Sequence, residues 1–94
     1  MSQNYSYPIF ESWNRNEIIS MMSLYNSVEK AYEDNNGINK DQIIELYKHF
    51  QSINPSKMEQ KQIDSNFFNI SGYSIYKTFK AATNNKSKNV RMNK

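Results

Sequence analysis

The 94-residue chain contains no cysteine, which excludes a disulfide framework and a thiolate metal site and fits a reducing compartment. Its two glycines and two prolines are too few for the many turns of a β-sandwich. No apolar run approaches the roughly 18 residues of a membrane helix, and the N-terminus lacks the basic and apolar regions of a signal peptide. These absences predict one small, soluble, cytoplasmic domain.

Positive charge is concentrated near the C-terminus. The chain has 12 basic and 9 acidic residues, for a net charge of +3. Residues 84–94 contain four of the basic residues and no acid, so the body formed by residues 1–83 is nearly neutral. Because this segment has few apolar side chains besides Val90 and Met92, it is predicted to be a flexible, disordered basic tail.

Helix-start signals occur at three places. Asn14, Asn39 and Ser56 each precede an apolar segment and are followed three residues later by Glu or Gln, as at capped helix N-termini. Pro55 and Gly72 are residues that end helices. We therefore predict an all-α, compact bundle of four short helices preceded by an extended N-terminal arm. The predicted bounds are 1–14 for the arm and about 15–35, 40–53, 57–70 and 73–83 for the helices.

Each predicted helix has an apolar face suited to a core. Glu29 falls inside the face of the first helix, where a carboxylate would either reach water at the edge or pair with a lysine or a tyrosine hydroxyl from another helix. A catalytic carboxylate is the alternative. The residues predicted to face the core are Ile18, Met21, Met22, Tyr25, Val28 and Tyr32, then Ile43, Leu46, Tyr47, Phe50 and Ile53, then Ile63, Phe67 and Ile70, and finally Ile75, Tyr76, Phe79 and Ala82.

Four sequence strings together resemble a known family. They are Tyr7-Pro8-Ile9 with Trp13 and Glu17, the run Val28 to Glu33, Pro55-Ser56-Lys57 with Glu59 and Lys61, and the run Ser71 to Lys77. In this order they resemble uncharacterised protein family 0223, small proteins of low-GC Gram-positive bacteria. The resemblance implies a small helical bundle and implies no activity. The sequence departs from the family's pattern at residues 34–36, where it is longer, and at Phe68, where a polar residue is expected.

The sequence offers no set of residues typical of catalysis. His49 is the only histidine, no cysteine is present for it to activate, and we interpret it as a packed residue. Glycine motifs of phosphate-binding loops are absent, although the helix N-terminus after Gly72 could attract an anion. The sequence thus predicts no enzyme, no cofactor and no metal site.

Aromatic and basic residues suggest an interaction surface. The leading hypothesis is a non-enzymatic, adaptor-like protein-interaction module with an unknown protein partner, and self-association into a homo-oligomer is left open. The alternative is weak nucleic-acid or ribosome association through lysines and rings of the last two helices and the basic tail. The candidate contact residues are Tyr7, Trp13, Lys57, Lys61, Tyr73 and Lys77.

Overall fold

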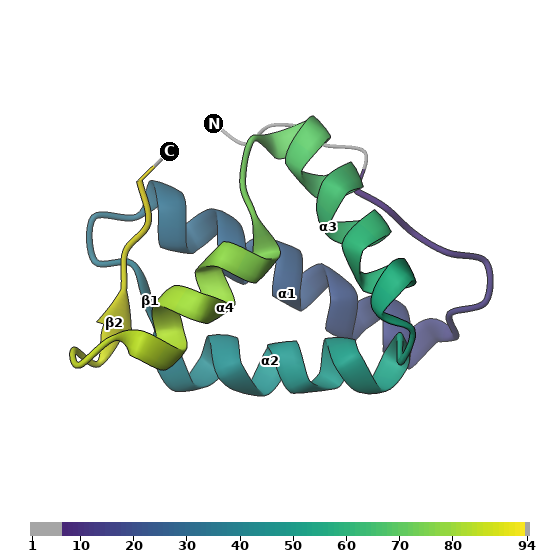
Figure 1. Cartoon of the computed structure of the whole chain (residues 1–94), viewed down its shortest axis with the longest axis horizontal. Helices are drawn as coiled ribbons and strands as arrows, with labels where there is room; N and C mark the ends of the chain where they lie inside the picture. Colours follow the sequence, from purple (N-terminus) through teal and green to yellow (C-terminus); the bar gives the residue numbers. More distant parts are fainter. Residues whose placement is uncertain (1–6, 94) are drawn as a thin grey trace.

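The structure is a computed structural model that describes residues 7–93. Its helices begin and end within two residues of the predicted bounds, and the all-α prediction is confirmed. Residues 1–6 of the predicted arm lie outside the described residues. In chain order the elements are α1 (Arg15–Glu33), β1 (Ile38–Asn39), α2 (Lys40–Ile53), α3 (Lys57–Ser71), α4 (Ile75–Asn84) and β2 (Asn89–Val90) (Figure 1).

The helix ends follow from local chemistry. At the start of α1, the Asn14 side chain accepts a hydrogen bond from the Glu17 backbone N–H, and the Glu17 side chain accepts one from the Asn14 N–H. These reciprocal bonds satisfy two N–H groups that have no partner within the helix. At the end of α3, Gly72 has a φ of 81°, a left-handed conformation that glycine adopts without strain.

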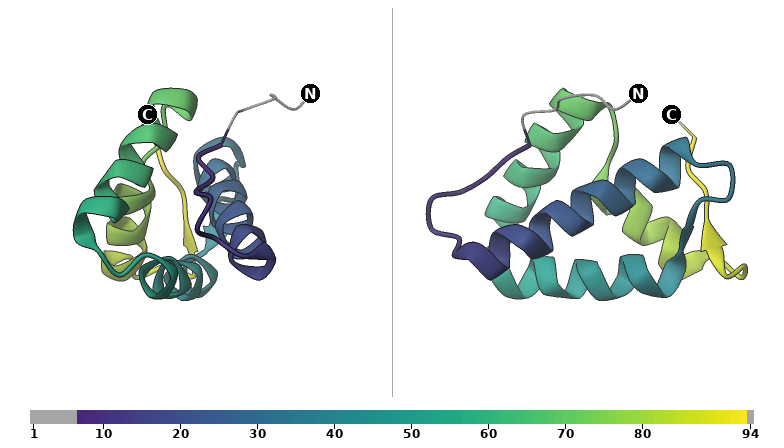
Figure 2. Two further views of the ribbon diagram at one scale, coloured as in Figure 1. Left: turned by 90° about the vertical axis from the view of Figure 1, so that its right-hand side faces the viewer. Right: turned by 180° about the vertical axis from the view of Figure 1, so that it is seen from behind.

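The helices enclose one core. Seen end-on, α1 stands on one side and α3 and α4 on the other, with α2 along the bottom (Figure 2). Phe50 on α2, only 2% exposed, is among the largest buried side chains of this core. None of the helices within residues 7–93 is long and apolar enough to cross a membrane. The buried apolar residues are Trp13, Met21, Leu24, Tyr25, Val28, Ala31, Ile38, Ile43, Tyr47, Phe50, Ile63, Phe67, Tyr73, Ile75, Ala82 and Val90.

Two predicted core positions are corrected by the structure. Ile70 is 37% exposed and Tyr76 is 49% exposed. On α3 the buried face continues from Phe67 to Ser71, one turn later, and the Ser71 hydroxyl donates to the Phe67 carbonyl at 2.8 Å. Burying this polar side chain is tolerated because it is hydrogen-bonded, and the face that it occupies leaves Ile70 at the rim.

The prediction of a disordered tail over residues 84–94 is wrong for most of that segment. β2 pairs antiparallel with β1, with Val90 opposite Ile38, and Val90 is 1% exposed. The Met92 backbone N–H donates to the Ala31 carbonyl at 2.7 Å. A single buried valine with backbone hydrogen bonds therefore fixes a segment whose composition indicates disorder.

Candidate functional site

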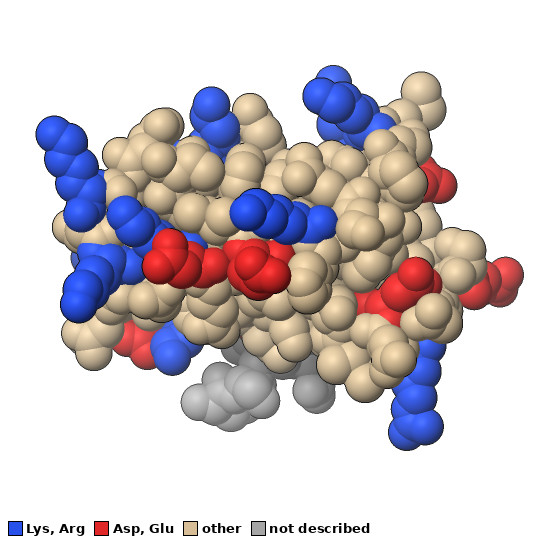
Figure 3. Space-filling view, turned by 90° about the horizontal axis from the view of Figure 1, so that it is seen from below, with Lys and Arg blue, Asp and Glu red and all other residues tan. Residues whose placement is uncertain are grey.

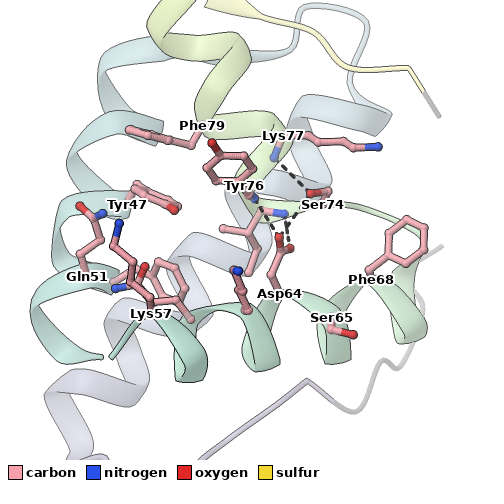
Figure 4. A pocket seen from close by; sticks show the side chains of 14 residues that line it. Tyr47, Gln51, Lys57, Asp64, Ser65, Phe68, Ser74, Tyr76, Lys77 and Phe79 are labelled. Atoms are coloured by element: carbon pink, nitrogen blue, oxygen red, sulfur yellow. Dashed lines mark hydrogen bonds between the residues drawn. The ribbon is translucent and has the colours of Figure 1, made fainter. Parts of the chain in front are cut away.

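A groove opens between α2, α3 and α4 (Figure 4). Its volume is about 740 Å³, within the usual range for ligand sites, and we call it the α2–α3–α4 groove. It is lined by Tyr47, Phe50, Gln51, Lys57, Gln60, Lys61, Asp64, Ser65, Phe68, Ser74, Ile75, Tyr76, Lys77 and Phe79.

The floor of the groove is apolar. Phe50 and Ile75 are almost fully buried, and the rings of Tyr47 and Phe79 stack with centroids 3.9 Å apart. Two aromatic side chains at the groove remain open to solvent, because Phe68 is 52% exposed and Tyr76 is 49% exposed. The groove thus combines a fixed apolar floor with rings that a bound molecule could cover.

Three lysines surround this apolar floor. Lys57 and Lys61 lie one turn apart on α3, and Lys77 lies in the first turn of α4. All three are exposed. Within residues 7–93 the only ion pair joins two side chains of α2 outside the groove, so none of the three lysines forms an ion pair there. The charge of Lys77 still acts on Asp64 of the lining.

Asp64 is the single acidic residue of the lining, and it joins α3 to α4. Its carboxylate accepts the backbone N–H of Ile75 at 2.7 Å and that of Tyr76 at 3.3 Å (Figure 4). The Ser74 hydroxyl also donates to it, at 3.4 Å. Burial raises the pKa of Asp64, and these three hydrogen bonds together with the charge of Lys77 partly oppose that rise.

The N-terminus of α4 is therefore already occupied by an anion. The sequence hypothesis of an anion site after Gly72 is not supported, because the N–H groups of Ile75 and Tyr76 bind Asp64 and that of Lys77 donates to the Ser74 hydroxyl. Helical periodicity indicates only that Asp64 lies off the apolar stripe of α3. No local pattern connects it with a helix that begins eleven residues later, so sequence reasoning missed this residue.

Five of the six predicted contact residues divide into two groups. Lys57, Lys61 and Lys77 come together around the groove. Trp13 and Tyr73 are each 6% exposed and do not form a contact surface.

Trp13 and Tyr73 can be buried because their polar atoms form hydrogen bonds with residues distant in the sequence. The Trp13 indole N–H donates to the Asn54 side-chain oxygen at 2.8 Å. The Tyr73 hydroxyl donates to a carboxylate oxygen of Glu33 at 2.5 Å, and its ring stacks on Tyr32 with centroids 4.3 Å apart. Both aromatic residues therefore stabilise the fold.

Tyr7 fixes the N-terminal arm to the bundle. Its ring centroid lies 5.0 Å from that of Tyr25 and 5.6 Å from that of Phe67, and its hydroxyl donates to a carboxylate oxygen of Glu29. Of the alternatives that the sequence left open for Glu29, the structure shows pairing with a tyrosine hydroxyl, although this tyrosine comes from the arm and not from another helix. Burial raises the pKa of Glu29, the hydrogen bond from Tyr7 lowers it, and the charge of Glu33 raises it.

His49 is not a packed residue. Its side chain is 53% exposed, and its Nε2 atom lies 3.3 Å from a carboxylate oxygen of Glu45, one turn earlier on α2. Within residues 7–93, no three histidine, cysteine or acidic side chains gather where they could hold a metal ion.

Charge on the face that includes α2 is mixed. Seen from below, lysines and arginines gather at the end where β1 and β2 lie, next to acidic residues in the middle of the face (Figure 3). This face has no uninterrupted basic surface of the kind that tracks a nucleic-acid backbone.

Residues 4–91 match the Uncharacterised protein family (UPF0223). The chain is 43% identical over 84 residues to a UPF0223 protein of Streptococcus gordonii, with 89% of each chain covered. It is 45% identical over 82 residues to one from Streptococcus agalactiae, covering 87% of this chain and 86% of the relative. It is 38% identical over 89 residues to one from Oceanobacillus iheyensis, covering 95% of this chain and 99% of the relative.

Proposed function

The chain belongs to the Uncharacterised protein family (UPF0223), which has no assigned function, and we propose a function from the groove. The protein is a non-enzymatic, adaptor-like module that binds an acidic, amphipathic segment of a partner protein in the α2–α3–α4 groove. The observation that carries this proposal is the position of Lys57, Lys61 and Lys77 around an apolar floor, with none of the three in an ion pair within residues 7–93.

The apolar part of the groove would supply affinity. Phe68 and Tyr76 are each about half exposed, and full burial of a large apolar side chain contributes about 1.5 to 3 kcal/mol. Covering the two rings would therefore contribute on the order of 1 kcal/mol each. Aromatic residues in a desolvated pocket are typical of interface positions that dominate binding.

The lysines would supply specificity and orientation. Acidic side chains of the partner would face Lys57 and Lys61 on α3 and Lys77 on α4. Exposed charge pairs add little affinity, but they speed association and disfavour partners of like charge. A basic segment should therefore be rejected even where its apolar residues fit the floor.

Nucleic acid is the alternative occupant. It is favoured by the spacing of Lys57 and Lys61 beside the exposed ring of Phe68, since lysines can contact phosphates and rings can stack on bases. The mixed charge of the face that includes α2 speaks against it, because a nucleic-acid backbone tracks a continuous basic surface (Figure 3). The experiment below separates the two occupants.

A photo-crosslinking residue at the groove tests the proposal. Phe68→p-benzoylphenylalanine is introduced in three backgrounds expressed in the native bacterium. They are the wild type, a groove variant with Lys57→Glu, Lys61→Glu and Lys77→Glu, and a control with Lys48→Glu, Lys80→Glu and Lys86→Glu. The control changes the net charge equally at exposed lysines outside the groove lining.

We expect nuclease-resistant crosslinks in the wild type and the control and their loss in the groove variant. Mass spectrometry of the crosslinked peptide should identify a segment that contains both carboxylates and large apolar residues. Crosslinks to RNA that disappear with nuclease would favour the alternative. Crosslinks that are equally strong in the groove variant and the control would refute the role of the groove.

The proposal assigns the bound segment to a different protein and places the complex in the bacterial cytoplasm. The lack of cysteine and the bacterial relatives support this location. Self-association through the same groove would give concentration-dependent sedimentation that the groove variant abolishes. We expect the purified protein to sediment as a monomer.

A further inference from the structure

The first turn of α4 offers no free backbone N–H group to an extended peptide. The N–H groups of Ile75 and Tyr76 donate to Asp64, and that of Lys77 donates to the Ser74 hydroxyl. Of the described residues, only β1 and β2 form strands, and they pair with each other at one end of the molecule (Figure 1). An extended segment therefore could not add to a sheet edge in this groove.

Two polar side chains of the lining are also already engaged. The Gln60 side-chain N–H donates to the Asn54 carbonyl at 2.8 Å, and the Ser74 hydroxyl bonds both Lys77 and Asp64. A peptide that enters in extended form would bury several backbone N–H and C=O groups without partners. Each such group is costly, whereas a helix satisfies its own backbone.

The dimensions of the groove suit a helix. Its α3 wall runs from Lys57 to Phe68, about 16 Å at 1.5 Å per residue. A partner helix of about three turns has this length and presents apolar side chains at positions i, i+4 and i+7 along one face. Its flanking acidic residues would then lie beside the lysines on both walls.

We infer that the partner segment binds as an amphipathic α-helix of about three turns, laid between α3 on one side and α2 and α4 on the other. This inference rests on the proposed function, because it specifies the conformation of the ligand in the same groove. The bound helix would pack on three helices at once and would cover Phe68 and Tyr76.

A displayed library of random 15-residue peptides tests the inference with the full-length protein. Peptides are selected on the wild type and then measured against the groove variant and the lysine control described above. Each selected peptide is resynthesised with proline at a central, outward-facing position and, as its matched control, with alanine there. Proline opposes helix formation and leaves the apolar contacts in place.

We expect the selected peptides to bind the lysine control as tightly as the wild type and to lose binding to the groove variant. The proline version of each peptide should bind on the order of 100-fold more weakly than its alanine version. Peptides that need the groove lysines but whose affinity changes by less than about threefold with proline would overturn the inference of a bound helix. The proposed function would then remain intact. An empty selection, or peptides that bind the groove variant and the control equally, would overturn the proposed function itself.

Discussion

The contact between α3 and α4 depends on Asp64, and the substitution Asp64→Ala tests it. The carboxylate accepts two backbone N–H groups, those of Ile75 and Tyr76, and the hydroxyl of Ser74. Ile75 is 1% exposed, so water cannot readily replace its lost partner. Tyr76 is half exposed, and its N–H can bond to water once the carboxylate is gone.

The expected magnitude follows from these exposures. A buried donor left without a partner costs about 1 to 3 kcal/mol, and most of this cost falls on the N–H of Ile75. We expect Asp64→Ala to lower the free energy of unfolding by about 2 kcal/mol. For a domain of this size, that corresponds to a decrease in Tm of roughly 8 to 16 °C. Asp64→Asn keeps an acceptor oxygen and should lose about half as much.

Thermal unfolding followed by circular dichroism measures the effect. Asp41→Ala is the matched control, because Asp41 is an exposed acid in the first turn of α2 and contacts no other helix through a hydrogen bond in the described residues. We expect its Tm to stay within about 2 °C of the wild type. A similarly small change for Asp64→Ala would show that the carboxylate does not hold α3 to α4.

The same residue gives a prediction about pH. The pKa of Asp64 is raised in the folded protein, chiefly by burial, so the folded state binds the proton more tightly than the unfolded chain. The stability that this pKa difference adds is therefore fully present below the unfolded pKa of about 3.9 and is lost as pH rises through the folded pKa. Relative to Asp64→Asn, the wild type should gain stability when the pH is lowered from 7 towards 4. A stability difference in urea that is constant over this range would contradict the assignment.

Two further predictions concern segments outside the groove. Tyr7→Phe should lower the free energy of unfolding by about 1 to 2 kcal/mol in urea and raise the pKa of Glu29 in an NMR titration, because the hydrogen bond that favours the carboxylate is lost. Gly37→Ala should displace β2 and accelerate amide exchange of Met92, because Gly37 has a φ of 68° and an added Cβ would lie 2.0 Å from the Val90 carbonyl oxygen.

Each of these changes has a control in the same chain. Tyr76→Phe removes a hydroxyl from a half-exposed ring, and its stability should stay close to that of the wild type. Gly72→Ala imposes the same left-handed strain away from β2. Once the change in the free energy of unfolding is taken into account, the Met92 amide should exchange at the wild-type rate. If Gly72→Ala and Gly37→Ala accelerated amide exchange of Met92 equally, the close packing at Gly37 would not be the cause of that acceleration.

The helices could be predicted from the sequence because their signals are local. The reciprocal bonds of Asn14 and Glu17 span three residues, and Gly72 ends α3 by its own conformation. All three groove lysines are among the predicted contact residues, and Lys57 and Lys61 are one helical turn apart. Periodicity within a helix decides which side chains share a face.

The parts that could not be predicted depend on contacts between distant residues. Val90 pairs with Ile38 in the two-stranded sheet. The indole N–H of Trp13 donates to the side-chain oxygen of Asn54, 41 residues away. Composition alone marks Trp13 as a contact residue and the segment around Val90 as disordered. Both interpretations fail because the partners lie elsewhere in the chain: a side-chain acceptor for Trp13, and backbone hydrogen bonds for the segment around Val90.

The groove itself follows from how α3 is attached. Its two fully buried apolar side chains are Ile63 and Phe67, and Phe67 stacks on Tyr25 of α1 with centroids 4.9 Å apart. Towards α2 and α4, α3 is held by polar bonds of Asp64 and Gln60. Bonds at these two points join the walls without filling the space between them, so the rings of Phe68 and Tyr76 stay exposed at the groove. Because these bonds already fix the walls, a partner would not have to order them, and more of the contact energy would remain as affinity.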